Sequence, residues 1–288
     1  MKIGICFNPY NNEYARFGNE KFAKIAQHGF SAVDYNMADT DIEIYKLNDS
    51  ELKKKMLEEK AAADLANIEI SQVHGPWRWP PQDSTAELRR ERMAKMKRSI
   101  FATRLLGCKY WVVHPIMPYG VEEDSTENAQ KTWELNIEFM SELLEYARSQ
   151  NVTICLENMP MRRFSMATPT KVLEFIKVIN DPYFKICLDT GHVAVFPDLS
   201  VSDSVRKLGT EIKVLHVHDN AGDRDAHMFP TKGIIDWKAF LDSLDEVGFD
   251  GVFSLETLPS AALDDKSFEA ECIRLFNIAK SIIESSRL

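Results

Sequence analysis

The segment from Val214 to His227 has the sequence VLHVHDNAGDRDAH and places three histidines and three aspartates within fourteen residues. Imidazole and carboxylate groups are the ligands that proteins offer to zinc, manganese and similar divalent ions. A polar surface loop of the same composition is the alternative. To decide between a metal site and a surface loop, the strands and helices that would position these side chains must first be identified.

Short apolar runs rich in β-branched and aromatic residues alternate with longer amphipathic helical patterns along the whole chain. This alternation is typical of βα units joined into a parallel sheet. The helical patterns include residues 50–67, 86–107, 127–150 and 237–248, with Ser50 as an expected N-cap and Gly107 and Gly248 as expected C-terminal caps. The predicted strands are Lys2–Phe7, Ala32–Asn36, Ile68–His74, Tyr110–His114, Val152–Glu157, Phe184–Asp189, Ile212–His218 and Gly251–Glu256.

Eight βα units in 288 residues predict a (β/α)8 TIM barrel of the α/β class. No linker or low-complexity tract divides the chain, so we expect residues 1–288 to form a single domain. A doubly wound nucleotide-binding sheet lacks support, because no GxGxxG motif follows a predicted strand.

The C-terminal ends of the strands carry the active site in such barrels. A single histidine or acidic residue at a strand end often has only a structural role, as a cap or a hydrogen-bonding partner. Here six consecutive strands end in a possible metal ligand, and clustered carboxylates repel one another unless a cation neutralises them. These strand-end residues are His74, His114, Glu157, Asp189, His216 or His218, and Glu256.

Three more residues extend the candidate site. His192 follows Asp189 in LDTGH and is expected to bind metal or to hold Asp189 in place. Asp225 and His227 alternate along a loop, so both can face one point, although a solvent-exposed turn is the competing interpretation. Imidazole with carboxylate and no thiolate favours manganese or zinc.

Composition narrows the class of protein. The net charge of −9 argues against a broad nucleic-acid surface, and the basic run Arg89–Arg98 has the pattern of a solvated helix face. Five scattered cysteines are interpreted as buried reduced thiols. No run resembles a membrane span or a signal peptide, so we expect a cytoplasmic protein.

An ordered series of motifs, from Gln72 to Thr257, resembles the xylose-isomerase-like TIM barrel superfamily. This superfamily contains sugar-phosphate isomerases and epimerases, ketose 3-epimerases and the endonuclease IV type of abasic-site nuclease (AP endonuclease family 2). Each motif is weak alone, whereas the ordered set is specific and, with the barrel periodicity, covers nearly the whole chain. The motifs are VHGPW, VVHP, CLEN, CLDTGH, LHVHDN, DAH, GIIDW and FSLET.

The resemblance implies a central metal held by two glutamates, an aspartate and a histidine, with the glutamates acting as acid and base in epimerases. His192 matches a position that touches substrate in epimerases and binds metal in nucleases. His218 departs from the nuclease pattern, which has an amide there; the motif favours His216 as the ligand, although strand alternation places both on one face. The implied central ligands are Glu157, Asp189, His216 and Glu256, and His74, His114, His192, Asp225 and His227 match the remaining ligands of a trinuclear cluster, so one to three ions are expected.

The leading hypothesis is a metal-dependent isomerase or epimerase of a sugar, sugar phosphate or related polyol ketone. One of Glu157 and Glu256 would remove a proton next to the carbonyl, and the other would return one. Trp77, with Trp79, is a candidate to stack on the sugar. Arg224 and Lys232 are candidates to bind its hydroxyl or phosphate groups, or are solvated loop charges.

The competing hypothesis is a metal-dependent phosphodiester hydrolase of the endonuclease IV type, acting on abasic-site DNA. The full ligand set supports it. The loops 37–50 and 117–128 oppose it, because they are acidic or neutral where a duplex-binding protein needs lysine and arginine. Lyase or dehydratase chemistry and a non-catalytic binding barrel are further alternatives, and a homo-oligomer is compatible with the resemblance.

Overall fold

Eight parallel strands form one sheet in the computed structural model, which describes residues 1–10, 13–81 and 83–285. Neighbours in the chain are neighbours in the sheet, and β1 also pairs with β8. The predicted strands are confirmed with shifts of one or two residues at some ends. The strands are β1 (Lys2–Phe7), β2 (Ala32–Asn36), β3 (Glu69–His74), β4 (Tyr110–Val113), β5 (Thr153–Glu157), β6 (Phe184–Asp189), β7 (Ile212–His216) and β8 (Val252–Leu255).

The sheet closes between β7 and β8 through the residue that follows β7. The Val217 amide donates to the Ser254 carbonyl at 2.8 Å, and the Glu256 amide donates to the Val217 carbonyl at 3.0 Å. The predicted TIM barrel is therefore confirmed, and closure brings the C-terminal ends of all eight strands to one mouth.

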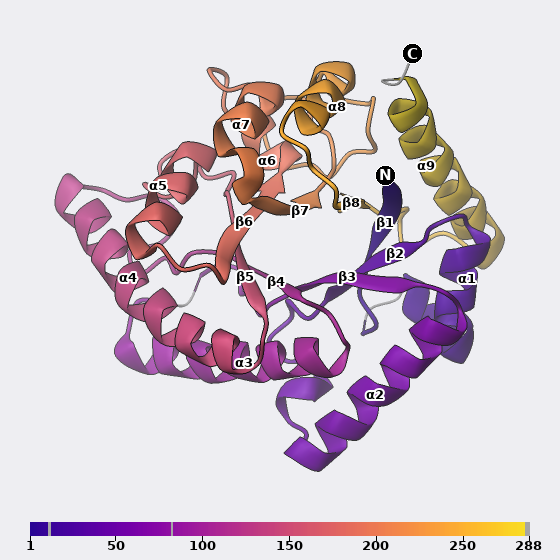
Figure 1. Ribbon diagram of the computed structural model, residues 1–288, viewed down its shortest axis with the longest axis horizontal. Coiled ribbons are helices and arrows are strands. Elements are labelled where there is room, and N and C mark those ends of the chain that lie inside the picture. The colour runs from indigo at the N-terminus through magenta and orange to yellow at the C-terminus, as the bar shows by residue number, and fades with distance from the viewer. Residues whose placement is uncertain (11–12, 82, 286–288) are drawn as a thin grey trace.

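The helices lie outside the strands and cover the barrel (Figure 1). Short 3-10 turns at Tyr14–Glu20, Glu43–Tyr45 and Gly209–Glu211 complete the connections. None of the described helices is long and apolar enough to cross a membrane. The helices are α1 (Lys21–Gln27), α2 (Asp49–Leu65), α3 (Ala86–Leu105), α4 (Thr126–Ser149), α5 (Pro169–Ile179), α6 (Thr190–Ala194), α7 (Val201–Leu208), α8 (Trp237–Glu246) and α9 (Asp265–Ser285).

Two of the three predicted helix caps are confirmed, and the third is wrong. Asn48, not Ser50, caps α2, because its side chain accepts from the amides of residues 50 and 51 while Glu51 accepts from the Asn48 amide. Gly107 and Gly248 lie just beyond α3 and α8 with φ of +72° and +68°, as expected of C-terminal capping glycines.

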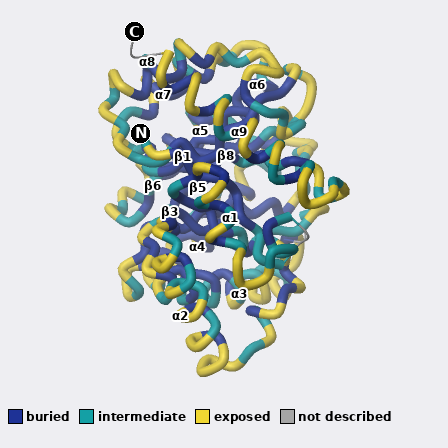
Figure 2. The backbone as a smooth tube through the Cα atoms, turned by 90° about the vertical axis from the view of Figure 1, so that its right-hand side faces the viewer, coloured by how far each residue is buried: buried dark blue, intermediate teal, exposed yellow. Residues whose placement is uncertain are grey.

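Burial is concentrated in the strands and the inner faces of the helices (Figure 2). In α3, Met93, Met96 and Ile100 are buried, so the basic run lies on a helix with an apolar face, as expected. The predicted solvated face is only partly right, because the side chains of Arg92, Lys95 and Arg98 are 11%, 19% and 18% exposed and form ion pairs with Asp83, Glu91 and Asp49. All five cysteines are buried and free, as expected.

Two irregularities in strand pairing affect the mouth of the barrel. Val33 pairs with Ile70 but Asp34 pairs with Gln72, so β3 carries an extra residue. The pairing of β6 with β7 shifts in the same way between Ile186 and Cys187. Such bulges change the direction in which the following side chains point. Both bulges precede a histidine that ends its strand and faces the candidate site.

Candidate metal centre

Six of the seven histidines gather at the C-terminal mouth of the barrel, together with four carboxylates. The seventh, His28, lies elsewhere and contacts the Tyr14 hydroxyl at 3.0 Å. The gathered residues are His74, His114, His192, His216, His218 and His227, with Glu157, Asp189, Asp225 and Glu256. Every metal-ligand candidate of the sequence analysis is thus brought to one place.

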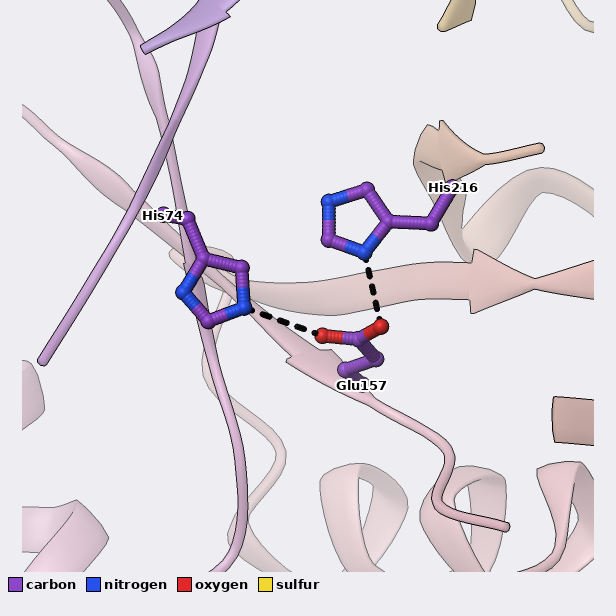
Figure 3. A group of neighbouring side chains, drawn as sticks. All are labelled: His74, Glu157 and His216. Atoms are coloured by element: carbon purple, nitrogen blue, oxygen red, sulfur yellow. Dashed lines mark hydrogen bonds and ion pairs between the residues drawn. The ribbon is translucent and has the colours of Figure 1, made fainter. Parts of the chain in front are cut away.

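Glu157, at the end of β5, lies between imidazoles from three other strands or their ends. Its Oε1 is 2.7 Å from His216 Nδ1, and its Oε2 is 3.0 Å from His114 Nε2 and 3.5 Å from His74 Nε2. Figure 3 shows His74 and His216 on either side of this carboxylate. Both oxygens of Glu157 therefore face nitrogen atoms rather than solvent.

A central donor group consists of Glu157, Asp189, His216 and Glu256. Each offers one ligand atom, and these four atoms all lie within 4.8 Å of one another. Donors about 2.1 Å from a common ion are themselves about 3–4 Å apart. The spacing therefore fits a single divalent ion with only small movements of the side chains.

A second donor group lies on the loop after β7. Asp225 Oδ2 is 3.2 Å from His192 Nε2 and 3.2 Å from His227 Nε2. The loop turns at His227, whose φ is +43°. The two loop residues expected to face one point therefore do so, and His192 from α6 faces the same carboxylate.

Backbone carbonyls determine which nitrogen of three histidines faces the site. The Nδ1–H groups of His74, His192 and His227 donate to the carbonyls of Gly75, Asn158 and Glu256 at 2.8, 2.7 and 2.6 Å. A carbonyl only accepts, so each Nδ1 carries a proton and each Nε2 faces the carboxylates. This is the arrangement that metal-binding histidines adopt.

His218 has a different place from His216. Its Nε2 contacts Asp189 Oδ2 at 3.0 Å, and its ring stacks on His227 with centroids 4.1 Å apart. Asp189 Oδ1 accepts from the His192 amide at 2.6 Å as the cap of α6. His216 reaches the two glutamates, whereas His218 holds the other oxygen of Asp189.

Two opposing effects set the pKa values of the site. Burial disfavours the charged form of each side chain, whereas a neighbouring group of opposite charge favours it. Burial lowers the pKa of His114 to about 4, and Glu157 offsets this only in part. For His192 and His227 burial also acts downward, but the neighbouring carboxylates outweigh it and raise the pKa of each to about 10. Burial raises the pKa of Glu256, which His216 and His227 offset only partly.

Several buried polar atoms of the site lack a hydrogen-bond partner among the described residues. They are His114 Nδ1, His218 Nδ1, Asp225 Oδ1 and Glu256 Oε2. Buried polar atoms are normally satisfied, so unpaired carboxylate oxygens beside imidazoles indicate room for another group. The donors present suit a divalent cation of the zinc or manganese kind, because no cysteine belongs to any of the described donor groups.

A cavity of about 480 Å³ opens over the donors. Trp77 packs edge-on against His114 with centroids 4.4 Å apart, and Trp79, 66% exposed, stands at the rim. Arg224 and Lys232 are exposed and do not line this cavity. The lining residues are Asn36, Ala38, His74, Trp77, Trp79, His114, Glu157, Met159, Pro160, Met161, His192, Asp225, His227 and Glu256.

Sequence reasoning missed Asp34 and Asn158. Asp34 lies within β2, 1% exposed, and its Oδ2 is 2.8 Å from His216 Nε2. Asn158 follows Glu157 and exchanges two hydrogen bonds with the backbone of Asp189, at 2.9 and 3.1 Å. An acidic residue in the middle of the apolar run AVDYN was the available signal for Asp34.

The sequence of this chain matches the model of a known protein family. The family described as xylose isomerase-like TIM barrel matches residues 22–273. The chain belongs to this family. The expected resemblance is thereby confirmed.

Relatives and solved structures within this fold include sugar epimerases and isomerases. An uncharacterized protein of Methanocaldococcus jannaschii is 28% identical over 89% of this chain and 83% of the relative. An inosose isomerase of Bacillus subtilis is 24% identical over 58% of this chain and 60% of its own. The structure of a D-tagatose 3-epimerase-like protein has a TM-score of 0.77 at 25% identity, covering 100% of this chain and 98% of that one.

We predict that residue 191 must be glycine, because the imidazole ring of His218 occupies the space that a side chain would need. A Cβ at residue 191 would lie 1.9 Å from His218 Cε1, so Gly191→Ala must displace the ring and should lower the free energy of unfolding by about 1–3 kcal/mol. Urea unfolding of metal-free protein measures this. His218→Ala removes the obstacle, so the double variant should be less destabilised than the sum of the two single variants; simple additivity would contradict the assignment.

Proposed function

We propose that this protein is a divalent-metal-dependent isomerase or epimerase of a sugar or related polyol ketone. The observation that carries the proposal is the convergence of Glu157 and Glu256 on one imidazole nitrogen: Glu157 Oε1 and Glu256 Oε2 lie 2.7 and 3.3 Å from the same atom, His216 Nδ1. Both glutamates line the cavity. A pair of carboxylates at one substrate site suits removal and return of a proton.

Glu157, Asp189, His216 and Glu256 would hold the cation, zinc or manganese. When bound, it would supply Lewis-acid chemistry that acidifies the C–H bond next to a carbonyl and stabilises the charge of the resulting enediolate. His74, His114, His192, Asp225 and His227 offer donors for one or two more ions.

The chain's own residues would then move the proton. One of Glu157 and Glu256 takes it from the carbon next to the carbonyl, and the other delivers one to the product. His192 lines the cavity beside these carboxylates and would bind a substrate hydroxyl. Asn158 hydrogen-bonds to the backbone of Asp189, and this would fix the position of Asp189 relative to Glu157.

The aromatic wall supports a sugar-like substrate. Trp77 and Trp79 line the cavity together with Met159 and Met161, and indole faces pack well on the C–H face of a sugar ring. Arg224 and Lys232 would contact a substrate only after movement of their loops, so their proposed hydroxyl or phosphate contacts depend on closure over the ligand.

We predict that Glu157→Gln and Glu256→Gln each abolish proton exchange. Loss of an acid or base costs about 10²–10⁴-fold in rate. The assay incubates protein with D-tagatose, D-psicose, D-fructose or an inosose in D2O and follows deuterium at the carbon next to the carbonyl by NMR. Metal content is measured on every variant, because both glutamates are also proposed ligands.

The matched control is Glu69→Gln, which changes an exposed glutamate at the N-terminal end of β3, paired with Lys2 on the far side of the barrel. It should retain wild-type exchange. Wild-type exchange in the Glu157→Gln, Glu256→Gln double variant would refute the acid and base roles.

We also predict that metal binding releases protons. His192 and His227, with pKa values raised to about 10, are protonated at neutral pH in the metal-free protein, and a cation must displace the Nε2 protons to use these nitrogens. Affinity should therefore rise from pH 6 to pH 9. Calorimetry at pH 7 in buffers of different ionisation enthalpy counts the protons. A heat of binding independent of buffer would show that neither histidine binds the ion.

A metal-dependent phosphodiester hydrolase of the endonuclease IV type is the second candidate. It is favoured by the gathering of all nine donors of a trinuclear cluster at one mouth. The net charge of −9 and the exposed acidic loop residues Glu122 and Asp124 disfavour a nucleic-acid duplex.

One pair of assays separates the two candidates. An epimerase should exchange deuterium into a ketose and leave an abasic-site duplex intact at low salt. A nuclease should cleave the duplex with three equivalents of zinc and show no exchange. Cleavage without exchange would reverse the order of the candidates.

A further inference from the structure

Asp34 is a buried carboxylate beneath the candidate metal centre. It is 1% exposed in the middle of β2, between the fully buried Val33 and Tyr35. It does not line the cavity and so does not face a substrate. Burying a carboxylate is costly unless specific partners stabilise it, so its contacts need an explanation.

Two side chains hold Asp34 in place. Its Oδ2 faces His216 Nε2 at 2.8 Å and accepts a hydrogen bond from Gln72 Nε2 at 3.1 Å. Gln72 Nε2 also donates to the Leu215 carbonyl at 3.2 Å, one residue before His216. The extra residue in β3 puts Gln72 opposite Asp34 in the sheet. Gln72 therefore ties the carboxylate to the strand that carries His216.

The two nitrogens of His216 face opposite groups. Nε2 faces Asp34, whereas Nδ1 faces Glu157 Oε1 at 2.7 Å and Glu256 Oε2 at 3.3 Å. A neutral imidazole carries one proton, and a carboxylate only accepts. In the structure both nitrogens lie within hydrogen-bond distance of carboxylates, so each of them donates a proton. A cation at the point where the glutamates converge would need the lone pair of Nδ1, which is available while the remaining proton stays on Nε2, held by Asp34.

We propose that Asp34 is a positioning residue that fixes the orientation and tautomer of His216, so that Nδ1 serves as a metal ligand. The inference rests on the proposed metal centre and deepens it. His74, His192 and His227 are oriented by backbone carbonyls. His216, which reaches both glutamates, is instead oriented by a carboxylate, a stronger acceptor that also makes the imidazole a better donor to a cation.

Without Asp34 as an acceptor, the one proton of a neutral His216 is no longer held on Nε2 and can lie on Nδ1 instead. A protonated Nδ1 would donate to Glu157 Oε1 and occupy the position that a cation needs. Loss of such a partner of a ligating histidine typically weakens metal binding about 10–100-fold. The predicted defect is therefore in affinity for the ion, and it is measurable without substrate.

The experiment compares wild type with Asp34→Ala and Asp34→Asn. Affinity for Zn²⁺ and for Mn²⁺ is measured on metal-free protein by competition with a chelating dye. Asp34→Ala should lose about 10–100-fold. Asp34→Asn should lose less, because its amide oxygen can still accept from His216 while its NH2 takes the place of Oδ1, which has no hydrogen-bond partner among the described residues.

The matched control is Ser254→Ala, which removes a fully buried hydroxyl from β8. Ser254 Oγ has no hydrogen-bond partner among the described residues and belongs to none of their donor groups. It should bind zinc with wild-type affinity. Thermal unfolding of each metal-free variant shows that the barrel is intact.

Nitrogen-15 NMR of the zinc-loaded protein reports which nitrogen of His216 carries the proton. A loss of packing alone would not change this. In wild type, the His216 Nε2 signal should be that of a protonated nitrogen and Nδ1 that of a metal-bound one. In Asp34→Ala the Nε2–H signal should broaden or be lost, and its persistence unchanged would contradict a role in fixing the tautomer.

Each outcome decides the inference. Wild-type affinity in folded Asp34→Ala, or an equal loss in Ser254→Ala, overturns it while leaving the metal centre standing. If Asp34→Ala does not fold, Asp34→Asn decides, and an affinity equal to that of Ser254→Ala overturns the proposal. Absence of zinc and manganese binding in wild type would instead overturn the metal centre, and this inference with it.

Discussion

The arrangement of this protein depends on the carboxylate of Glu157. It contacts imidazoles from β3, from the end of β4 and from β7, and it lies in the same donor group as Asp189 and Glu256. Three carboxylates this close repel one another, and their burial increases the cost. The neighbouring histidines offset this charge, and a divalent cation would do so at shorter range. The other histidines at the mouth of the barrel lie where they offset the charge of these carboxylates.

Rigid elements carry the donors, and backbone groups orient them. Carbonyls fix the Nδ1 protons of three histidines, Thr190 links its hydroxyl to the backbone of His218, and Asn158 ties β5 to β6. Such support lets a site keep its geometry while substrate enters and leaves. Trp77, Trp79, Met159 and Met161 supply apolar surface to the cavity beside the donor groups. Charged and apolar side chains thus line the same cavity.

Most of the fold was predictable because its signals are local. The alternation of β-branched runs with amphipathic helices predicts the eight βα units, and the histidine and acidic residues at the strand ends predict the direction of the site. Asp34 was missed because its partner, His216, lies 182 residues away and no spacing rule links them. Ser50 was chosen as a cap from its residue type alone, whereas backbone geometry selects Asn48.

The sequence by itself determined the barrel and the donor residues at the ends of its strands, since residue type and periodicity are encoded locally. Only the tertiary structure decided how His216 and His218 divide their roles. Both lie on one face of the chain by alternation, yet the ring of His218 fits against Gly191 and reaches Asp189, while His216 reaches Glu157 and Asp34. The distinction arises from barrel closure and from the space beside each ring, which are properties of distant segments packed together.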